Sequence, residues 1–325
     1  MQVDSRDIWT SVIKQTRSLS DLAALKASNK LSSSLVHARP VEWIKERFHA
    51  LSIDWLWNWL LLQPIAVSGS FILQCLLDEH WSSDIDLFFM YDASIEGHNQ
   101  TSNPIPPGNA TLIMKYELVD LLLKHGFTTD TRLVDGAGNT YALNKFYSSK
   151  YTRDDGTSKL SSLSCLLANK LTIDIIQLKS HDLLDSTLIS EISNSFDFDF
   201  CKNILLRGKL TMLHPESVIT RSCVYSPTRM LNIYVRGGQP NQLNQLLIMY
   251  YSCKLGPRYT KYTNRKFTIR VTAVEKQALS AAMQTLPPIC PNDLMYLFIY
   301  GMFQGLNYGV ILQQINAYIA GLEVV

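Results

Sequence analysis

The chain has 325 residues, of which 46% are hydrophobic and 18% are charged, and its formal net charge at pH 7 is +2. This composition excludes a disordered or fibrous protein, and the length allows one large core or two smaller ones. The small net charge neither indicates nor excludes a polyanionic partner, because binding follows local charge. The six cysteines stand singly, without the spacing of a zinc site or a disulfide framework. No basic and apolar leader opens the chain, which predicts an intracellular, cytoplasmic protein.

The first part of the chain predicts helices and then a strand, a turn, a helix and a second strand. Residues 1–60 read as an N-terminal helical segment, in which 41–51 place apolar side chains near one face. Residues 64–70 (PIAVSGS) predict a short buried strand that ends in a turn. A helix is predicted over 71–81, and a second strand over 84–92 (DIDLFFMYD).

The middle of the chain alternates loops with further elements. Residues 92–109 are polar and rich in Pro and Gly, which predicts a long surface loop, and a helix is expected over 111–125. Hairpin-type turns are predicted near 135–160. KLTIDIIQLKS, at 170–180, predicts an apolar strand with one carboxylate at its middle, and a helix is expected near 182–194.

The last third is predicted to form strands and then helices. Residues 195–213 read as strands, in which Asp197 and Asp199 alternate with phenylalanines, and this indicates a half-solvated strand rather than extra metal ligands. The uncharged stretch 294–312 is interrupted by Gln304, and we interpret it as buried helix rather than a membrane span.

Together these elements predict an α+β fold with a mixed β-sheet, flanking helices, an N-terminal helical arm and a mostly helical C-terminal lobe. The expected domains are an N-terminal helical segment at 1–60, a middle domain of strands and helices at 61–220 and a mostly helical domain at 221–325.

Three aspartates fall within two of the predicted strands. Because strand side chains alternate between faces, Asp84 and Asp86 should project from the same side. Two carboxylates this close repel each other unless a cation lies between them, and hard divalent ions suit oxygen ligands at this spacing. Asp174 on a neighbouring strand would complete a site for two Mg²⁺ or Mn²⁺ ions. Taken singly, each of these residues also fits an ordinary exposed strand position.

Gly69 and Ser70 precede the helix predicted over 71–81. Glycine lets a phosphate approach the backbone, and serine either caps the helix or bonds a phosphate oxygen. The pair therefore predicts a triphosphate-binding turn that faces the metals, with a plain helix start as the alternative.

The ordered set of motifs resembles a known superfamily. Gly-Ser at a helix start, DID on the next strand and a lone Asp on a later strand are similar to the pattern of the nucleotidyltransferases related to DNA polymerase β, which include poly(A) polymerases and CCA-adding enzymes. SGSFILQCLL, SDIDLF, TIDIIQ and FDFDFCKN also resemble, in this order, segments of uncharacterised nucleotidyltransferase-like proteins of large DNA viruses and some fungi. The resemblance covers about residues 61–220, and it implies that they form a nucleotidyltransferase-like catalytic domain with a mixed β-sheet of that type. DEHWSS, at 78–83, departs from it because it lacks the glycines common there.

The resemblance implies a role for each matched residue. Gly69 and Ser70 would bind the nucleotide phosphates, Asp84 and Asp86 would ligate metal, and Asp174 would bind the catalytic metal and orient or deprotonate the attacking hydroxyl. The implied reaction is template-independent transfer of a nucleoside monophosphate from an NTP to an acceptor hydroxyl, with an RNA 3′ end as the expected acceptor and no membrane partner. The alternative is a catalytically silent binding or scaffold protein with the same fold. A viral protein would act in the host cytoplasm or the virion.

A late segment adds basic residues at helical spacing. They allow two interpretations: a solvated helix face, or a strip in which Arg258 and Lys261 contact a triphosphate or an RNA backbone while tyrosines stack on a base. The segment contains Lys254, Arg258, Tyr259, Lys261, Tyr262 and Arg265.

Overall fold

The structure is a computed structural model, and it describes residues 10–13, 15–28, 33–92, 110–129, 160–168, 171–180, 182–225, 256–284 and 308–325. The chain divides into two compact units. The first contains the described residues up to 129 and from 160 to 219, and the second contains those from 220 onward. The expected domain boundaries after residues 60 and 220 stay predictions. The long loop and the hairpin turns expected over 93–109 and 130–159 lie outside the described residues.

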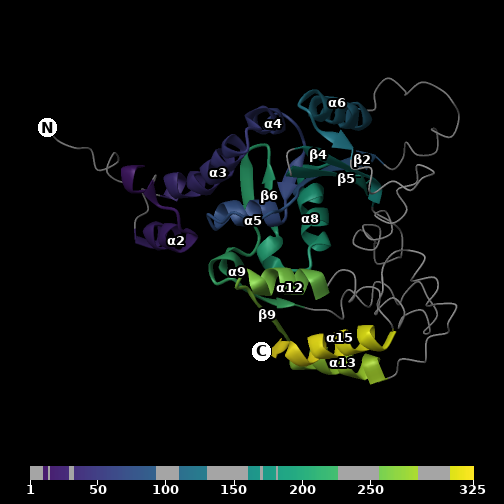
Figure 1. Ribbon diagram of the computed structural model, residues 1–325. Helices are drawn as coiled ribbons and strands as arrows, with labels where there is room; N and C mark the ends of the chain where they lie inside the picture. The colour runs from purple at the N-terminus through teal and green to yellow at the C-terminus, as the bar shows by residue number, and fades with distance from the viewer. Residues whose placement is uncertain are drawn as a thin grey trace, which may run out of the picture. The chain divides into compact units, whose positions relative to one another are not determined.

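The first unit is built on a mixed sheet of seven strands in the order β3-β4-β5-β2-β1-β6-β7 (Figure 1). β2 and β5 run parallel, and all other neighbouring pairs in this sheet run antiparallel. The α+β class and the mixed sheet are therefore confirmed. The strands are β1 (Ala66–Ser68), β2 (Ile85–Asp92), β3 (Thr128–Thr129), β4 (Leu160–Ala168), β5 (Leu171–Ser180), β6 (Asn203–Leu206) and β7 (Lys209–Met212).

Strands β2 and β5 lie at the centre of the sheet because their sequences suit burial on both faces. A strand buried on both faces reads as an almost continuous apolar run. Leu87, Phe88 and Phe89 are fully buried in β2, as Ile175 and Ile176 are in β5. Carboxylates within such strands need a specific reason to be there.

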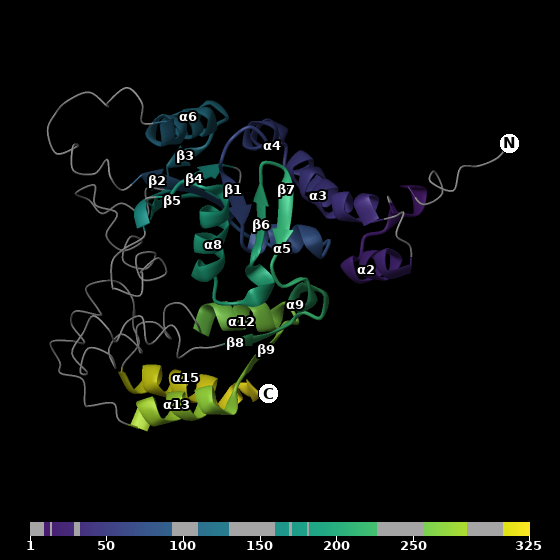
Figure 2. The same cartoon turned by 180° about the vertical axis from the view of Figure 1, so that it is seen from behind.

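Helices cover the middle of this sheet. α5 and α8 both pack against β1, β2 and β6, and α3 packs on α5, where the rings of Phe48 and Phe71 meet edge to face with centroids 5.3 Å apart (Figures 1 and 2). α3 thus contributes to the core of the first unit. The helices of this unit are α2 (Leu19–Ser28), α3 (Ser33–Ala50), α4 (Asp54–Leu60), α5 (Ser70–Leu76), α6 (Ala110–Lys124), α8 (Asp185–Ser195) and α9 (Pro215–Ile219).

Two predicted elements of the first unit differ from the structure. The helix expected over 71–81 ends at Leu76, and Asp78 beyond it has a φ of 52°, which is a left-handed conformation that ends a helix. The strand expected to start at residue 195 begins only at Asn203, because a short 3-10 helix at Asp199–Cys201 precedes it. This irregular segment still carries core side chains, since Phe198 and Phe200 are buried and stack with centroids 5.2 Å apart.

The second unit contains a small parallel sheet with helices. Its strand order is β10-β9-β8, and both neighbouring pairs are parallel. The expected C-terminal lobe was mostly helical, and this sheet was not predicted. None of the described helices is long and apolar enough to cross a membrane, and of the stretch 294–312 only 308–312 is described, at the start of α15. The elements are β8 (Ser222–Tyr225), α12 (Gly256–Asn264), β9 (Thr268–Val271), α13 (Ala273–Gln284), α15 (Tyr308–Gly321) and β10 (Glu323–Val324).

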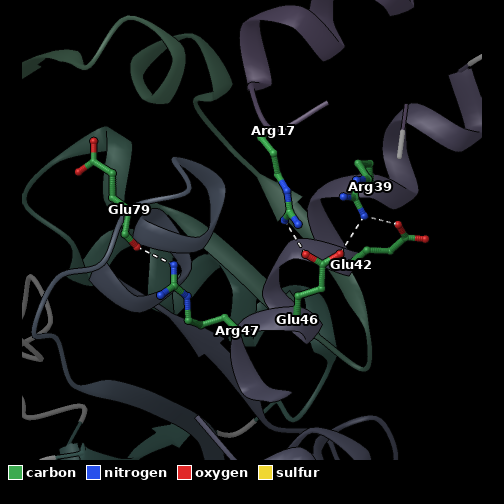
Figure 3. A network of polar contacts seen from close by, with 6 residues as sticks. All are labelled: Arg17, Arg39, Glu42, Glu46, Arg47 and Glu79. Atoms are coloured by element: carbon green, nitrogen blue, oxygen red, sulfur yellow. Dashed lines mark hydrogen bonds and ion pairs between the residues drawn. The ribbon is translucent and has the colours of Figure 1, made fainter. Parts of the chain in front are cut away.

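A charged network ties the N-terminal part of the chain to α3 (Figure 3). Arg17 donates to one carboxylate oxygen of Glu46 at 2.5 Å and Arg39 donates to the other at 3.0 Å. Arg39 is buried and also donates to Glu42 at 2.8 Å. Partial burial acts to raise the pKa of Glu46, but the hydrogen bonds and charges of Arg17 and Arg39 outweigh it and hold that pKa below its ordinary value of 4.5.

Loss of this charge should appear as a pH-dependent loss of stability. We expect Glu46→Gln to unfold more easily than the wild type at neutral pH, because a neutral amide binds two guanidinium groups less strongly. A carboxylate with a depressed pKa stabilises the fold above its ordinary pKa, and this contribution is lost as the pH falls through the folded-state pKa. The difference in urea unfolding free energy should therefore shrink below about pH 4.5. Glu117→Gln, at an exposed position of α6, serves as the control, and a pH-independent difference for Glu46→Gln would contradict the expectation.

Candidate active site

Asp86 and Asp174 lie side by side on two central strands of the first sheet, near the end where β2 begins. They are direct partners in the parallel register of β2 and β5. Neighbouring strands are about 4.8 Å apart, and residues in register project to the same face. Asp174 is only 3% exposed, whereas Asp86 is half-buried. The sequence pattern thus predicted Asp86 and Asp174 as site residues, and the fold brings these two carboxylates together.

Asp84 is placed differently from the other two aspartates. It immediately precedes the first residue of β2, and its side chain is exposed. Among the residues that the structure describes, no three His, Cys, Asp or Glu side chains form a group that could hold a metal. The donor set that is assembled is therefore the oxygen-only pair of Asp86 and Asp174, which suits Mg²⁺ or Mn²⁺ in chemical type. The three-ligand set that includes Asp84 stays a prediction.

Gly69 lies directly against the Asp86 carboxylate. Its φ of 83° and ψ of −152° are values that only glycine adopts readily. A Cβ atom at this position would lie 2.5 Å from Oδ2 of Asp86 and 3.3 Å from Cε1 of Phe196. The position therefore requires glycine for two separate reasons, the backbone conformation and the close approach of an acid.

Ser70 is the first residue of α5, and Gly69 occupies the N-cap. Because the N-cap is Gly69 and no side chain caps the helix, the capping role considered for Ser70 is wrong. The neighbouring Ser68 instead fixes the end of β1, because its hydroxyl donates to the backbone oxygen of Asn203 at 2.8 Å. The Ser70 side chain is partly exposed beside the Gly69–Asp86 contact.

An aromatic wall borders the carboxylate pair on the side of α8. Phe196 follows the last residue of α8 and contacts the Gly69 position, and its ring meets Phe88 at a centroid distance of 6.1 Å. Apolar surface beside an acid lowers the local dielectric and strengthens the binding of a cation there. Phe196 was not predicted as a site residue, although it belongs to FDFDFCKN, one of the segments that carry the resemblance.

Arg258 and Lys261 lie on α12 of the second unit, and both are partly buried. The base-stacking role considered for Tyr262 is wrong, because this ring is 5% exposed and packs edge to face on Phe267. Tyr259 likewise packs on Tyr318, with centroids 5.1 Å apart. The tyrosines of this segment thus serve the core of their own unit, and Lys254 lies outside the described residues.

No family model, curated protein or solved structure matches this chain. The interpretation of the site therefore depends on the geometry of the chain's own residues.

The requirement for glycine at position 69 can be tested by a comparison of two substitutions. Gly69 and Gly126 have the same φ of 83°, but a Cβ atom at Gly126 would meet nothing within 4 Å. We expect Gly69→Ala to lower the free energy of unfolding by about 1–3 kcal/mol more than Gly126→Ala, because only the first variant forces an overlap with Asp86 and because the ψ of −152° at Gly69 adds backbone strain. Chemical denaturation of both variants checks this, and equal losses would show that the close approach has no energetic weight.

Proposed function

We propose that the protein is a metal-dependent nucleotidyltransferase that moves a nucleoside monophosphate from an NTP to an acceptor hydroxyl. The observation that carries the proposal is the in-register pair of Asp86 and Asp174, with the Gly69 backbone pressed against the Asp86 carboxylate. Two acids in mostly apolar central strands are costly to bury, so they indicate a function other than packing.

The order of elements supports a nucleotidyltransferase-type fold as part of the same proposal. β1 ends at the Gly-Ser turn, α5 follows, and the chain returns as β2 antiparallel to β1 with Asp86 beside Ser68. β5 then adds parallel to β2 and supplies Asp174. The order β5-β2-β1 thus brings the turn and both acids to one end of the sheet.

Each residue has a defined task in the proposed reaction. Asp86 and Asp174, with Asp84 from the preceding loop, would hold two Mg²⁺ or Mn²⁺ ions. When bound, such ions neutralise charge on the phosphates and lower the pKa of an acceptor hydroxyl. Asp174 orients that hydroxyl and accepts its proton, which its burial among apolar strand residues favours. Gly69 leaves the backbone accessible to phosphate, and the Ser70 hydroxyl donates to a phosphate oxygen.

The bonds made and broken balance without another reactant. The acceptor oxygen forms a bond to the α-phosphorus of the NTP while the bond from that phosphorus to the β-bridging oxygen breaks. Pyrophosphate leaves, and the acceptor's proton passes to Asp174 and then to water. An RNA 3′ end is the acceptor that we favour, with Arg258 and Lys261 as its phosphate contacts.

A second candidate is a nucleotide-binding or scaffold protein with the same fold and no turnover. The exposed position of Asp84 favours it, because the described residues hold no assembled group of three metal ligands. The two candidates differ in their response to substrate. Thermal stabilisation by NTP that needs Mg²⁺ or Mn²⁺, together with release of pyrophosphate, supports the enzyme, whereas stabilisation without any release supports the binding protein.

Removing either central acid should abolish the transfer. We expect Asp86→Asn and Asp174→Asn to lose turnover by at least about 10³-fold, since each removes an anionic metal ligand, while the fold is retained because Asn has nearly the same shape. The assay is incubation with each labelled NTP, Mg²⁺ or Mn²⁺ and a short RNA, with products sized on a gel. Asp197→Asn provides the control from the other Asp-x-Asp sequence, and full activity of Asp86→Asn would reject the mechanism.

The choice of acceptor has a separate test in the second unit. If Arg258 and Lys261 contact an RNA backbone, the double change Arg258→Gln and Lys261→Gln should weaken RNA binding and flatten its salt dependence by about one unit of slope per lost phosphate contact. Affinity for the NTP should stay the same. The reverse outcome, lost NTP affinity with an unchanged salt slope, would assign the two residues to the triphosphate.

A further inference from the structure

A cavity of about 310 Å³ lies in the first unit between α3, α5 and the loop that precedes β2. This volume is at the lower end of the range for small-molecule sites. The cavity lining includes three apolar residues, Leu51, Phe71 and Leu171. The other lining residues are polar or aromatic: Arg47, Gln74, His80, Trp81, Ser82 and Ser83. Gly69, Ser70 and the three aspartates are not part of the wall, so the cavity is distinct from the proposed metal and triphosphate site.

The wall is held in shape by a buried amide. Gln74 is 4% exposed, and both ends of its side chain are used: Nε2 donates to the Ser83 hydroxyl at 2.6 Å, and Oε1 accepts from the backbone N–H of Trp81 at 2.9 Å. A loop without regular structure is thereby fixed by one residue of α5. Pre-organisation of this kind reduces the entropy that a ligand would otherwise lose on ordering the loop.

Arg47 fixes the other end of the same loop and supplies a positive charge. It donates to the backbone oxygen of Glu79 at 2.7 Å and to Nδ1 of His80. Figure 3 shows the Glu79 carboxylate pointing away from the guanidinium. No carboxylate forms part of the cavity wall, and no described carboxylate forms an ion pair with Arg47. Cys75 adds no negative charge either, because burial, only partly offset by Arg47, raises its pKa to about 12.

The hydrogen bond from Arg47 also sets the tautomer of His80. A guanidinium can only donate, so Nδ1 of His80 accepts and its proton lies on Nε2. The cavity lining therefore offers a cation, an imidazole N–H and serine hydroxyls to an anion, while Trp81 and the apolar lining residues offer surface for a flat ring.

We propose that this cavity binds a nucleoside monophosphate or a group of the same chemistry, a flat ring that carries a phosphate, with the phosphate toward Arg47 and His80 and the ring against Trp81. Ser83 lines the cavity and is adjacent in sequence to Asp84, so the ligand would lie beside the proposed metal site. Two molecules would carry this ring and phosphate into the cavity: the incoming nucleotide and the terminal nucleotide of an acceptor. The inference does not require that the protein be a transferase.

The test is calorimetric titration of the full chain with AMP in the absence of divalent metal, compared with adenosine and with inorganic phosphate. We expect AMP to bind more tightly than either fragment. Arg47→Gln should weaken AMP binding by at least about ten-fold, as expected for loss of a charged hydrogen bond. Because Arg47 also holds the loop, Ser82→Trp is the second variant: it fills the cavity from an exposed position and should abolish AMP binding. Ser186→Trp, exposed on α8, is its control and should leave AMP binding unchanged.

Specific outcomes overturn the proposal. It is wrong if AMP does not bind at millimolar concentration, if Ser82→Trp leaves the affinity unaltered, or if phosphate alone binds as tightly as AMP. A final experiment identifies which nucleotide the cavity binds. If ATP with Mg²⁺ competes with AMP, the cavity binds the incoming nucleotide. If AMP and ATP bind at the same time, the cavity binds the terminal nucleotide of the acceptor. AMP binding with no transfer activity would reject the proposed function and keep this site, whereas transfer activity without AMP binding would do the reverse.

Discussion

Two carboxylates held side by side in a parallel strand pair are the constraint on which the first unit depends. The register of β2 and β5 places Asp86 next to Asp174, and the residues before and after each acid along its own strand are apolar and buried. Like charges at this separation repel, and a buried carboxylate loses most of its hydration. The fold accepts this cost only at the end of the sheet where the Gly-Ser turn begins α5. The strand register, the turn and the start of α5 thus meet at this pair of acids.

The N-terminal helices contribute more than packing to this arrangement. α3 reaches the core through Phe48 and reaches the loop before β2 through Arg47. Buried Arg39 of the same helix donates to Glu46, which also accepts from Arg17. Glu46, Arg47 and Phe48 are consecutive, so the contacts of α3 with Arg17, with the loop and with the core all come from its last turns. α3 therefore shares with α5 the task of holding this loop in place.

The sequence predicted those features of the fold that depend on neighbours along the chain. DIDLFFMYD and TIDIIQ are strands by local composition, and Gly69 stands where a turn was expected. The cavity was not predicted, because its wall depends on Arg47 meeting Glu79 across 32 positions of sequence. The irregular segment before β6 was mistaken for a strand because Phe198 and Phe200 alternate with acids, although tertiary burial and not strand pairing explains their spacing. Long-range contacts of this kind leave little trace in local patterns.

The contact between Gly69 and Asp86 links the identities of two positions that lie 17 residues apart, from 69 to 86. While an acid occupies position 86, every residue larger than glycine at position 69 would overlap its carboxylate. If the acid at position 86 were lost, the overlap at 2.5 Å would vanish, but the backbone conformation of Gly69 and the ring of Phe196, 3.3 Å from a Cβ atom, would still disfavour any other residue. The dependence is therefore one-sided: glycine at position 69 would outlast the acid, whereas the acid at position 86 needs glycine opposite it.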